Sequence, residues 1–376
     1  MSKLIKVPFF NYPALFEQRK VEYTRVINDV LTRGAYIMQK DLFEFEEHLA
    51  DYLGVKHAIG MADGTMAILT SLIAAGIGDG DDVLVPSHTF VASAAAIYHA
   101  GAHPILVDCG QDHLIDPKSI EMSITDNTKA IMPVQLNGRV AKMDPILNIA
   151  NKHNLIILED SCQALGAKYN DRFAGTFGVA GTFSFFPAKT LGCFGDGGAV
   201  ITDQDQVAEK IRMMRDHGRD PVDGEVKVFG FNARLDNLHA AILNFKLKYY
   251  DEDITRRRDI ASIYEENLND IDTLLLPPGP ESDSQHYDIF QNYEIEANKR
   301  DDLRKFLARQ GVGTIIQWGG RTVHQFKKLR LSAQLDYTDK MTERFMLLPM
   351  HQMLKDEDVL YICEQIKIFY ETKYSS

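Results

Sequence analysis

The sequence predicts an α/β protein: a large domain with a mainly parallel seven-stranded sheet flanked by helices, followed by a smaller α+β domain. Between about residues 55 and 202, short apolar segments bounded by Gly, Asp or Pro alternate with helical patterns. Strands that are buried on both faces have this nearly continuous hydrophobicity. After about residue 220 the alternation stops. Because 376 residues are enough for two domains, we place the large domain at 1–250 and the small domain at 251–376.

The elements of the large domain follow from this alternation. Segments rich in β-branched or aromatic residues predict strands at 57–61, 83–86, 104–108, 130–134, 155–160, 182–186 and 198–202. Between them, the spacing of apolar residues predicts helices at 65–75, 92–100, 117–124 and 145–153. Strands and helices that alternate in this way imply a mainly parallel sheet with helices on both faces.

The small domain has a different pattern. A long amphipathic helix is predicted at 235–249 and a charged helix at 253–269, and a Pro/Gly-rich break follows at 277–280. The segments 286–296, 300–310 and 357–370 then mix strand and helix patterns at lower density. This change of pattern is the reason for a domain boundary near residue 250.

Composition excludes several classes of partner. The 41 basic and 53 acidic residues give a formal net charge of −12, so neither nucleic acid nor an anionic membrane is expected to bind. No segment approaches the ~20 apolar residues of a membrane span, and Met1 leads into Lys3 and Lys6 without the apolar run of a signal peptide. We expect a cytoplasmic protein without a metal site, whose cysteines are free thiols: Cys109, Cys162, Cys193 and Cys363.

Two residues next to predicted strands are suited to hold a cofactor that carries an aldehyde. Lys189 follows a strand and precedes the Gly-rich run at 195–198, where glycines let the backbone pass close to a ligand. Asp160 ends the strand at 155–160, at the edge of the sheet where open α/β folds bind ligands. Alone, such a lysine is usually a surface residue and such an aspartate is as often a helix cap. Lys189 follows Asp160 along the chain with one predicted strand between them, and this order favours a shared site.

Pyridoxal 5′-phosphate needs such a lysine to hold its aldehyde as a Schiff base, and such a carboxylate to keep its ring nitrogen protonated. It also needs an anion site and a flat group against the ring. Gly64 and Thr65 open a predicted helix, whose free N–H groups and dipole attract a phosphate, and Ser184 can add a hydroxyl. Phe90 can stack on the ring. The sequence therefore predicts a pyridoxal-phosphate enzyme in which this lysine and this aspartate are catalytic.

The motifs around these residues occur in a fixed order. They are Asp-Gly-Thr-Met-Ala (63–67), Pro-Ser-His-Thr-Phe-Val-Ala-Ser (86–93), Glu-Asp-Ser-Cys-Gln-Ala-Leu-Gly-Ala (159–167), Phe-Ser-Phe-Phe-Pro-Ala-Lys-Thr-Leu-Gly (183–192) and Gly-Asp-Gly-Gly-Ala (195–199), with further matches at 138, 144–145, 230–235 and 348–351. Together they resemble the pyridoxal-phosphate-dependent sugar-nucleotide aminotransferases, the DegT/StrS-type branch of the aspartate-aminotransferase fold. The resemblance runs from about residue 7 to the C-terminus.

The resemblance implies a role for each site residue. Lys189 would form the Schiff base and shuttle protons, Asp160 would bind the ring nitrogen, and Gln163 would neighbour the ring or its hydroxyl. Asn232 would be lent to the phosphate site of a partner subunit, so a homodimer with shared active sites is expected. Pyridoxamine 5′-phosphate would be the form of the cofactor between the two half-reactions. The phosphate contacts within the chain would come from Gly64, Thr65 and Ser184.

The resemblance also implies the reaction. An amino group would pass from an amino acid, with L-glutamate expected, to a keto-deoxysugar linked to a nucleoside diphosphate, and the amino sugar would feed polysaccharide or natural-product biosynthesis. Two stretches that lie near the sugar or nucleotide in the family depart from its usual pattern: Gln135 with Asn137, and the segment 317–324. The substrate-binding residues predicted in the second stretch are Trp318, Arg321 and His324.

Three other functions stay open at this point. A sugar 3-dehydratase shares the fold and cofactor, but a histidine typically replaces the Schiff-base lysine in those relatives, whereas position 189 is Lys. An aminotransferase could act instead on a non-nucleotide ketone such as a keto-cyclitol. A catalytically inactive regulatory homologue would not need the intact set of Lys189, Asp160, Gly64 and Thr65.

Overall fold

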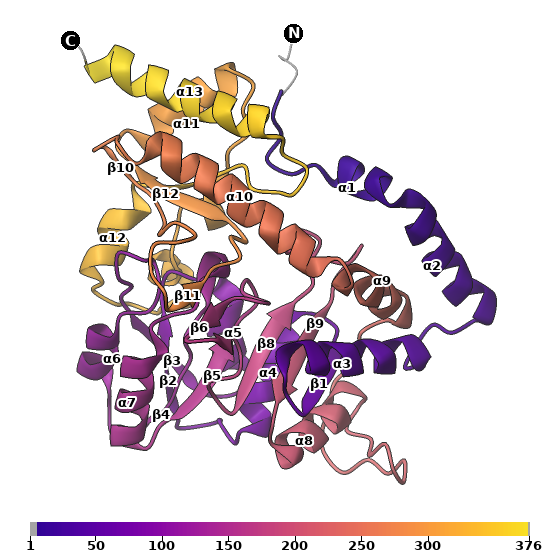
Figure 1. Ribbon diagram of the computed structural model, residues 1–376. Coiled ribbons are helices and arrows are strands. Elements are labelled where there is room, and N and C mark those ends of the chain that lie inside the picture. The colour runs from indigo at the N-terminus through magenta and orange to yellow at the C-terminus, as the bar shows by residue number, and fades with distance from the viewer. Residues whose placement is uncertain (1–5, 375–376) are drawn as a thin grey trace.

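The computed structural model describes residues 6–374, with side chains up to residue 371. Met1 and Lys3, on which the expectation about a signal peptide rests in part, lie outside these residues. The chain forms a lower body built on one large sheet and an upper body of helices and short strands (Figure 1). Within the described range, no helix is long and apolar enough to cross a membrane.

All seven predicted strands pair in one sheet, which confirms the predicted fold class. The sheet is mainly parallel, and only β9 is antiparallel to its neighbours. The spatial order is β1 (His57–Met61), β9 (Gly198–Thr202), β8 (Ala180–Ser184), β5 (Ile156–Asp160), β4 (Thr128–Ile131), β2 (Asp82–Pro86) and β3 (His103–Val107). Most of their side chains are buried, as expected for strands that are covered on both faces.

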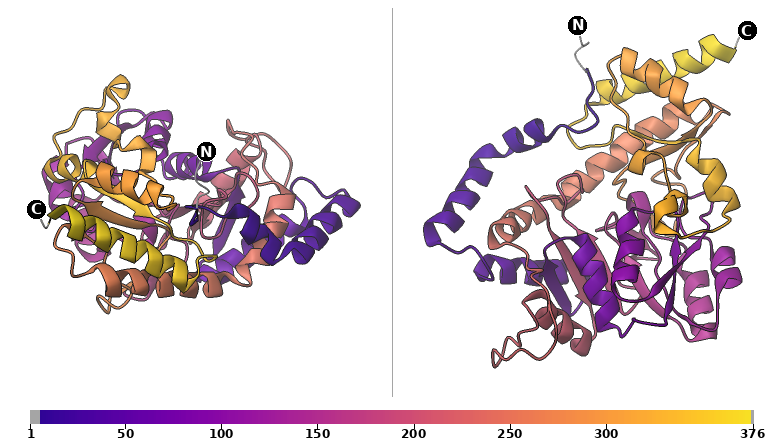
Figure 2. Two further views of the ribbon diagram at one scale, coloured as in Figure 1. Left: turned by 90° about the horizontal axis from the view of Figure 1, so that it is seen from above. Right: turned by 180° about the vertical axis from the view of Figure 1, so that it is seen from behind.

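Helices cover both faces of the sheet. α4 (Gly64–Ala74) lies behind it in Figure 1 and in front of it in the view from behind in Figure 2, whereas α3 (Lys40–Leu53) packs on the other face. The other predicted helices of this body are present as α5 (Val91–His99), α6 (Pro117–Ser123), α7 (Met143–His153) and α9 (Asn237–Leu247). In this body the prediction has no counterpart for α3, for α8 (Asp205–Arg215), or for the outer arm of α1 (Tyr12–Gln18) and α2 (Lys20–Arg33).

β8 ends earlier than predicted. The prediction extends this strand to residue 186, but it ends at Ser184. Pro187 has no N–H to donate to a neighbouring strand, and the Lys189 N–H closes a turn onto the Phe186 carbonyl at 2.8 Å. The residues after Ser184 therefore leave the sheet as a loop that carries the lysine. β4 also ends early, at Ile131 in place of residue 134.

The predicted site residues meet at one edge of the sheet because the parallel strands end there. β5 and β8 are neighbours, and Asp160 pairs with Thr182, two residues before Ser184 at the end of β8. β1 runs in the same direction and leads through a short turn to Gly64. β9 starts at this edge with Gly198, which approaches that turn so closely that a Cβ would lie 2.5 Å from the turn's backbone.

A second hydrophobic cluster lies above the sheet. It is built from α10 (Tyr250–Leu268), α11 (Arg300–Arg309), α13 (Asp356–Tyr374) and a small sheet of β10 (Leu274–Leu275), β12 (Tyr293–Ala297) and β13 (Phe345–Leu348). α10 joins the two clusters, since Tyr250 packs in the first and Tyr264 in the second. The boundary at 250/251 stays a prediction. The remaining elements are α12 (Asp336–Thr342) and the sheet of β11 (His286–Tyr287), β6 (Lys168–Tyr169) and β7 (Arg172–Phe173).

Candidate active site

A cavity of about 540 Å³ opens at the carboxyl edge of the large sheet. This volume is within the usual range of small-molecule sites, about 300–1,000 Å³. The cavity brings together residues from β5, β8, the N-termini of α4 and α5, and a turn of the upper body. Eight of the predicted site residues line it: Gly64, Thr65, Phe90, Asp160, Gln163, Ser184, Lys189 and Trp318.

Asp160 is buried, and its carboxylate is held by two hydrogen bonds. The Ser93 hydroxyl donates to Oδ2 at 2.7 Å, and the backbone N–H of Cys162 donates to Oδ1 at 3.1 Å. A carboxylate has about four acceptor positions, so Asp160 can still accept a charge-assisted hydrogen bond from a protonated ring nitrogen.

Lys189 reaches the cavity from the loop that follows β8. Burial lowers the pKa of its ammonium group, while the nearby Asp160 carboxylate opposes this change. The same burial raises the pKa of Cys162 well above its usual value, so this cysteine is a neutral thiol near pH 7. A lysine with a lowered pKa is suited to Schiff-base and proton-transfer chemistry.

The turn before α4 fits a phosphate. Asp63 caps the helix, because its carboxylate accepts from the Met66 N–H at 2.8 Å. The N–H groups of Gly64 and Thr65 precede the first bonded turn and are available to an anion. A Cβ at Gly64 would lie 3.0 Å from the Ser184 Cβ and 2.9 Å from the Cys162 Sγ. Glycine therefore lets the helix end pack directly against β8 and its serine hydroxyl.

Two aromatic rings line the cavity and remain exposed. Phe90 is 53% exposed at the start of α5, and Phe186 is 49% exposed in the lysine loop. An exposed phenyl ring in a concave site is available to a flat ligand. Phe90 was predicted for this role, whereas sequence reasoning missed Phe186, whose only signal is its place in the Phe-Phe-Pro run before the lysine.

Gln163 is oriented by the residues behind it. Its Oε1 accepts from the Asn137 N–H at 2.9 Å and from the Asn292 side-chain amide at 3.2 Å. With its oxygen engaged, its NH₂ group is left to donate to a ligand. Gln135, which departs from the family pattern together with Asn137, is fully buried. Its side-chain amide donates to the Glu159 carboxylate at 2.8 Å and accepts from the Ala141 N–H at 2.7 Å. It supports β5 and does not line the cavity.

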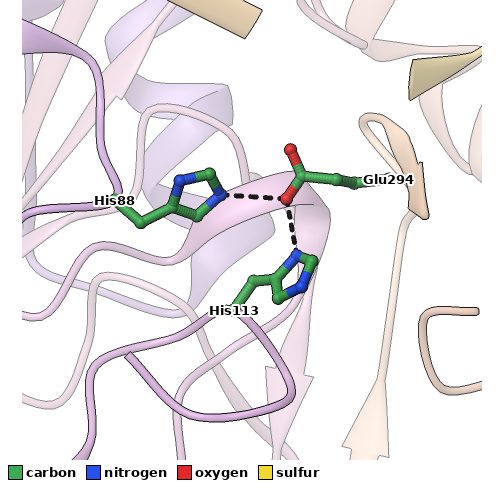
Figure 3. A group of neighbouring side chains, drawn as sticks. All are labelled: His88, His113 and Glu294. Atoms are coloured by element: carbon green, nitrogen blue, oxygen red, sulfur yellow. Dashed lines mark hydrogen bonds and ion pairs between the residues drawn. The ribbon is translucent and has the colours of Figure 1, made fainter. Parts of the chain in front are cut away.

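A buried cluster lies behind this wall, made of His88, His113 and Glu294 (Figure 3). Glu294 Oε1 is 3.0 Å from His88 Nε2 and 2.7 Å from His113 Nδ1. It also accepts from the Asn137 amide at 2.9 Å, and Oε2 accepts from the Gln317 amide at 2.8 Å. The cluster therefore joins the large body to β12 and to the turn that precedes Trp318.

These three residues are of the types that bind metal ions, but their hydrogen bonds favour an ion-paired network. His113 is bonded through both ring nitrogens, to Glu294 and at 3.2 Å to Glu296. Burial lowers the pKa of His113, but the bonds to the two carboxylates outweigh it and raise the pKa to about 9. A protonated imidazole has no lone pair for a metal.

Trp318 lines the cavity, and its ring packs edge-on against His88 with centroids 5.2 Å apart. It stands in the short helical turn Gln317–Gly319 with a φ of 52°. Arg321 and His324 do not line the cavity of the single chain, in contrast to the expectation. Arg321 is exposed, and His324 is a structural tether whose ring nitrogens bond Ser87 at 2.7 Å and Asp339 at 2.9 Å.

Asn232 also lies away from the cavity. It is exposed and makes a bridge with Asp216 at the base of the loop between α8 and α9, which projects from the body in Figure 1. Phe229 in the same loop is completely exposed. An exposed position in this chain is compatible with the expected contribution to a partner subunit.

Comparison with known proteins extends over nearly the whole chain. A family model described as the DegT/DnrJ/EryC1/StrS aminotransferase family matches residues 17–367. A "pleiotropic regulatory protein" of Geobacillus stearothermophilus is 39% identical over 370 residues, which cover 97% of this chain and 99% of that protein. A dTDP-3-amino-3,4,6-trideoxy-alpha-D-glucose transaminase of Streptomyces venezuelae is 38% identical over 316 residues, 83% of this chain and 82% of the relative.

The fold has close solved counterparts. A crystal structure of DesV from S. venezuelae, in complex with a ketimine intermediate, has a TM-score of 0.93 and 33% sequence identity, and the match covers 97% of this chain and 98% of the other. The match therefore extends over the parts of the chain that form both hydrophobic clusters.

Proposed function

The chain belongs to the DegT/DnrJ/EryC1/StrS aminotransferase family, and we propose that it moves an amino group from L-glutamate to a keto-deoxysugar linked to a nucleoside diphosphate. Enzymes of this family depend on pyridoxal 5′-phosphate, and this chain is an aminotransferase with that cofactor. One observation carries the proposal: Lys189, Asp160 and the N-terminus of α4 line a single cavity. They are the lysine, the carboxylate and the anion site that this cofactor requires.

The chemistry is divided between the cofactor and the protein. When bound, pyridoxal phosphate supplies a ring that delocalises the electron pair left when a carbon next to nitrogen loses its proton. In our proposal Lys189 Nζ accepts that proton and returns it as an acid in the next step. Its lowered pKa increases the share of neutral amine at a given pH. Asp160 keeps the ring nitrogen protonated, and glutamate leaves as 2-oxoglutarate.

The proposed acceptor is supported by the relatives and by the shape of the site. The S. venezuelae relative is named as the transaminase of a dTDP-linked amino sugar. The cavity is larger than a cofactor ring alone needs, and Trp318 of the turn Gln317–Gly319 contributes an indole to its lining. An indole offers a flat apolar face and one N–H donor to a sugar or a base.

A homodimer with shared sites is part of the proposal. Within the described residues, the cavity lining contains one ammonium group, that of Lys189, and the carboxylates of Asp63, Asp160 and Asp196. A cofactor phosphate and a substrate diphosphate need more positive charge and more donors than this. The exposed Asn232 and the projecting loop that carries it are the elements expected to supply donors to a partner's cavity.

A regulatory role without catalysis is the second candidate, because the relative from G. stearothermophilus is named a regulatory protein. The intact site argues against loss of catalysis here. Asp160 retains its two supporting hydrogen bonds, and the glycine at 64 that the helix–strand contact requires is present.

Transfer of labelled nitrogen tests the proposal. The holoenzyme is incubated with L-glutamate that carries heavy nitrogen and with a panel of keto sugars, nucleotide-linked or free, and the sugars are analysed by mass spectrometry. We expect the label in at least one nucleotide-linked sugar and in no free keto-cyclitol. If only a keto-cyclitol carries the label, the proposed nucleotide-linked acceptor is wrong and the acceptor is a free ketone. An absence of label in every ketone, with no conversion of glutamate, would favour the regulatory role.

A further inference from the structure

Gln291 connects the upper body of the molecule to the loop that carries Lys189. It lies two residues before β12 and is buried, and it does not line the large cavity. Its Oε1 accepts from the Thr190 N–H at 2.7 Å and from the Thr190 hydroxyl at 2.8 Å. Its Nε2 donates to the Ala188 carbonyl at 2.8 Å. One side chain therefore binds the backbone on both sides of the lysine.

The lysine loop has few other restraints at this point. The Lys189 N–H closes the turn onto Phe186 at 2.8 Å. Gly192 then passes so close to the turn that a Cβ would lie 2.7 Å from the Phe186 carbonyl oxygen. The first contact restrains the peptide before the lysine, but neither contact restrains the peptide after it, whose N–H belongs to Thr190 and binds Gln291. A lysine side chain has a flexible four-carbon stem, so the region that its Nζ explores depends on where the backbone places its Cα.

Gln291 is itself held rigidly. The buried guanidinium of Arg257 donates from Nη1 to the carbonyls of Phe290 at 3.0 Å and Gln291 at 3.1 Å. Gly138 lies so close that a Cβ there would be 2.6 Å from the Gln291 backbone nitrogen. The next residue, Asn292, binds Gln163 and Asn137 on the cavity wall. The amide thus extends from a fixed frame that also orients Gln163.

We propose that Gln291 is the positioning residue of Lys189: its amide fixes the peptides on both sides of the lysine, so that Nζ is held at the point where the cofactor's aldehyde is bound. This inference rests on the role of Lys189 in the proposed function. It goes beyond that role because Gln291 does not line the large cavity and acts through the backbone on either side of the lysine. A glutamine that only stabilised the interface would affect the melting temperature without affecting the lysine.

The test compares two ligands of the apoenzyme. Pyridoxal phosphate forms a bond to the lysine, with loss of water, whereas pyridoxamine phosphate has no aldehyde and binds without it. Gln291→Met keeps the volume and removes all three hydrogen bonds. Gln291→Glu keeps an acceptor for Thr190 and loses the donor to Ala188. Gln365→Met removes an equally buried glutamine of α13 as a matched control.

For Gln291→Met we expect the lysine–cofactor bond, followed by absorbance, to form about tenfold to a hundredfold more slowly, the range expected for a displaced reacting group. The affinity for pyridoxamine phosphate should change by less than about threefold, because the variant leaves the lining of the large cavity unchanged. A tenfold change in affinity would correspond to ~1.4 kcal/mol. Gln291→Glu should give an intermediate rate. Gln365→Met should bond at the wild-type rate even if its melting temperature falls.

A wild-type rate in Gln291→Met would overturn the inference, as would an equal loss of affinity for pyridoxamine phosphate. If Gln291→Met does not fold, Gln291→Glu decides, and a wild-type rate in that variant has the same meaning. The proposed function fails separately. It fails if the wild-type apoenzyme itself forms no borohydride-reducible bond to Lys189, whatever the variants do.

Discussion

Asp160 shows how a single residue can be prepared for its role before any ligand binds. Two donors, the Ser93 hydroxyl and the Cys162 N–H, fix the carboxylate at the end of β5. The sequence was sufficient to predict that Asp160 and Lys189 lie in one cavity, because both belong to motifs in a fixed order. It was not sufficient to predict Ser93 or Gln291 as their supports, since contacts between distant segments leave no local signal.

Replacing Asp160 by Asn should therefore reduce kcat by at least about a hundredfold, the usual effect of removing a preorganised charge from an active site. The shape is retained, but a neutral amide does not keep the ring nitrogen protonated. Steady-state transamination, with the bound cofactor quantified by absorbance, measures this. Wild-type turnover in Asp160→Asn would contradict the role given to the carboxylate. Ser93→Ala removes one of the two hydrogen bonds to the carboxylate but keeps its charge, so we expect a smaller loss of kcat.

His113 predicts a pH dependence of stability. Its pKa is raised from the ordinary 6.5 to about 9 in the folded protein. A raised pKa stabilises the folded state fully below pH 6.5, and this contribution is lost as the pH rises through about 9. The melting temperature should fall over this window in the wild type and less steeply in His113→Gln. Parallel curves for the two proteins would show that the cluster with Glu294 and Glu296 does not hold a charged imidazole.

At the scale of elements, the positions of the strands in the large sheet could be predicted from the sequence, but the last residues of some strands could not. Continuous hydrophobicity identified all seven strands of the large sheet. The end of β8 depends on a turn that Pro187 and Lys189 form together, which a hydrophobic pattern does not reveal. α3 could have been found, because its buried residues recur with helical spacing: Leu42, Phe45, Glu46, Leu49, Ala50 and Leu53. Arg321 and His324 lie outside the cavity of the single chain, because tertiary contacts decide where a loop points.

The turn Gln317–Gly319 is the element expected to recognise the acceptor. Trp318→Ala should raise KM for the keto-sugar nucleotide at least about tenfold, a loss of about 1.4 kcal/mol. Conversion of the cofactor by glutamate should remain nearly unchanged, because glutamate carries no sugar or nucleotide for the indole to contact. The two half-reactions are measured separately by stopped-flow absorbance. Equal damage to both, or only a lower melting temperature, would mean that Trp318 serves packing against His88.

At the scale of the whole molecule, the site combines residues of the large sheet with a turn of the upper body that packs against the first hydrophobic cluster. The large sheet supplies the lysine, the carboxylate and the phosphate turn, and the upper body supplies Trp318 and, through Gln291, the support of the lysine loop. Net charge and composition argued against nucleic acid and anionic membranes as partners, but they did not indicate the substrate. The single chain leaves Asn232 exposed and the cavity poor in positive charge, as expected if a second copy completes it.

Mixing two inactive variants tests this arrangement. Lys189→Ala and Asn232→Ala chains, each inactive or nearly so alone, should form hybrid dimers in which one of the two sites has both residues intact. Recovery approaching half of the wild-type activity per hybrid dimer is expected, measured after refolding or co-expression with two different tags. The shared-site proposal is wrong if a purified hybrid stays inactive, or if the active enzyme sediments as a monomer.

The central claim is that Lys189 is the lysine to which the cofactor is bonded. Borohydride reduction of the holoenzyme makes that bond permanent, and digestion followed by mass spectrometry identifies the peptide that carries it. We predict the pyridoxyl group on Lys189 alone, and its loss when the holoenzyme is first exposed to L-glutamate. A pyridoxyl group on any other lysine, or none on a protein that contains the cofactor, would contradict the account.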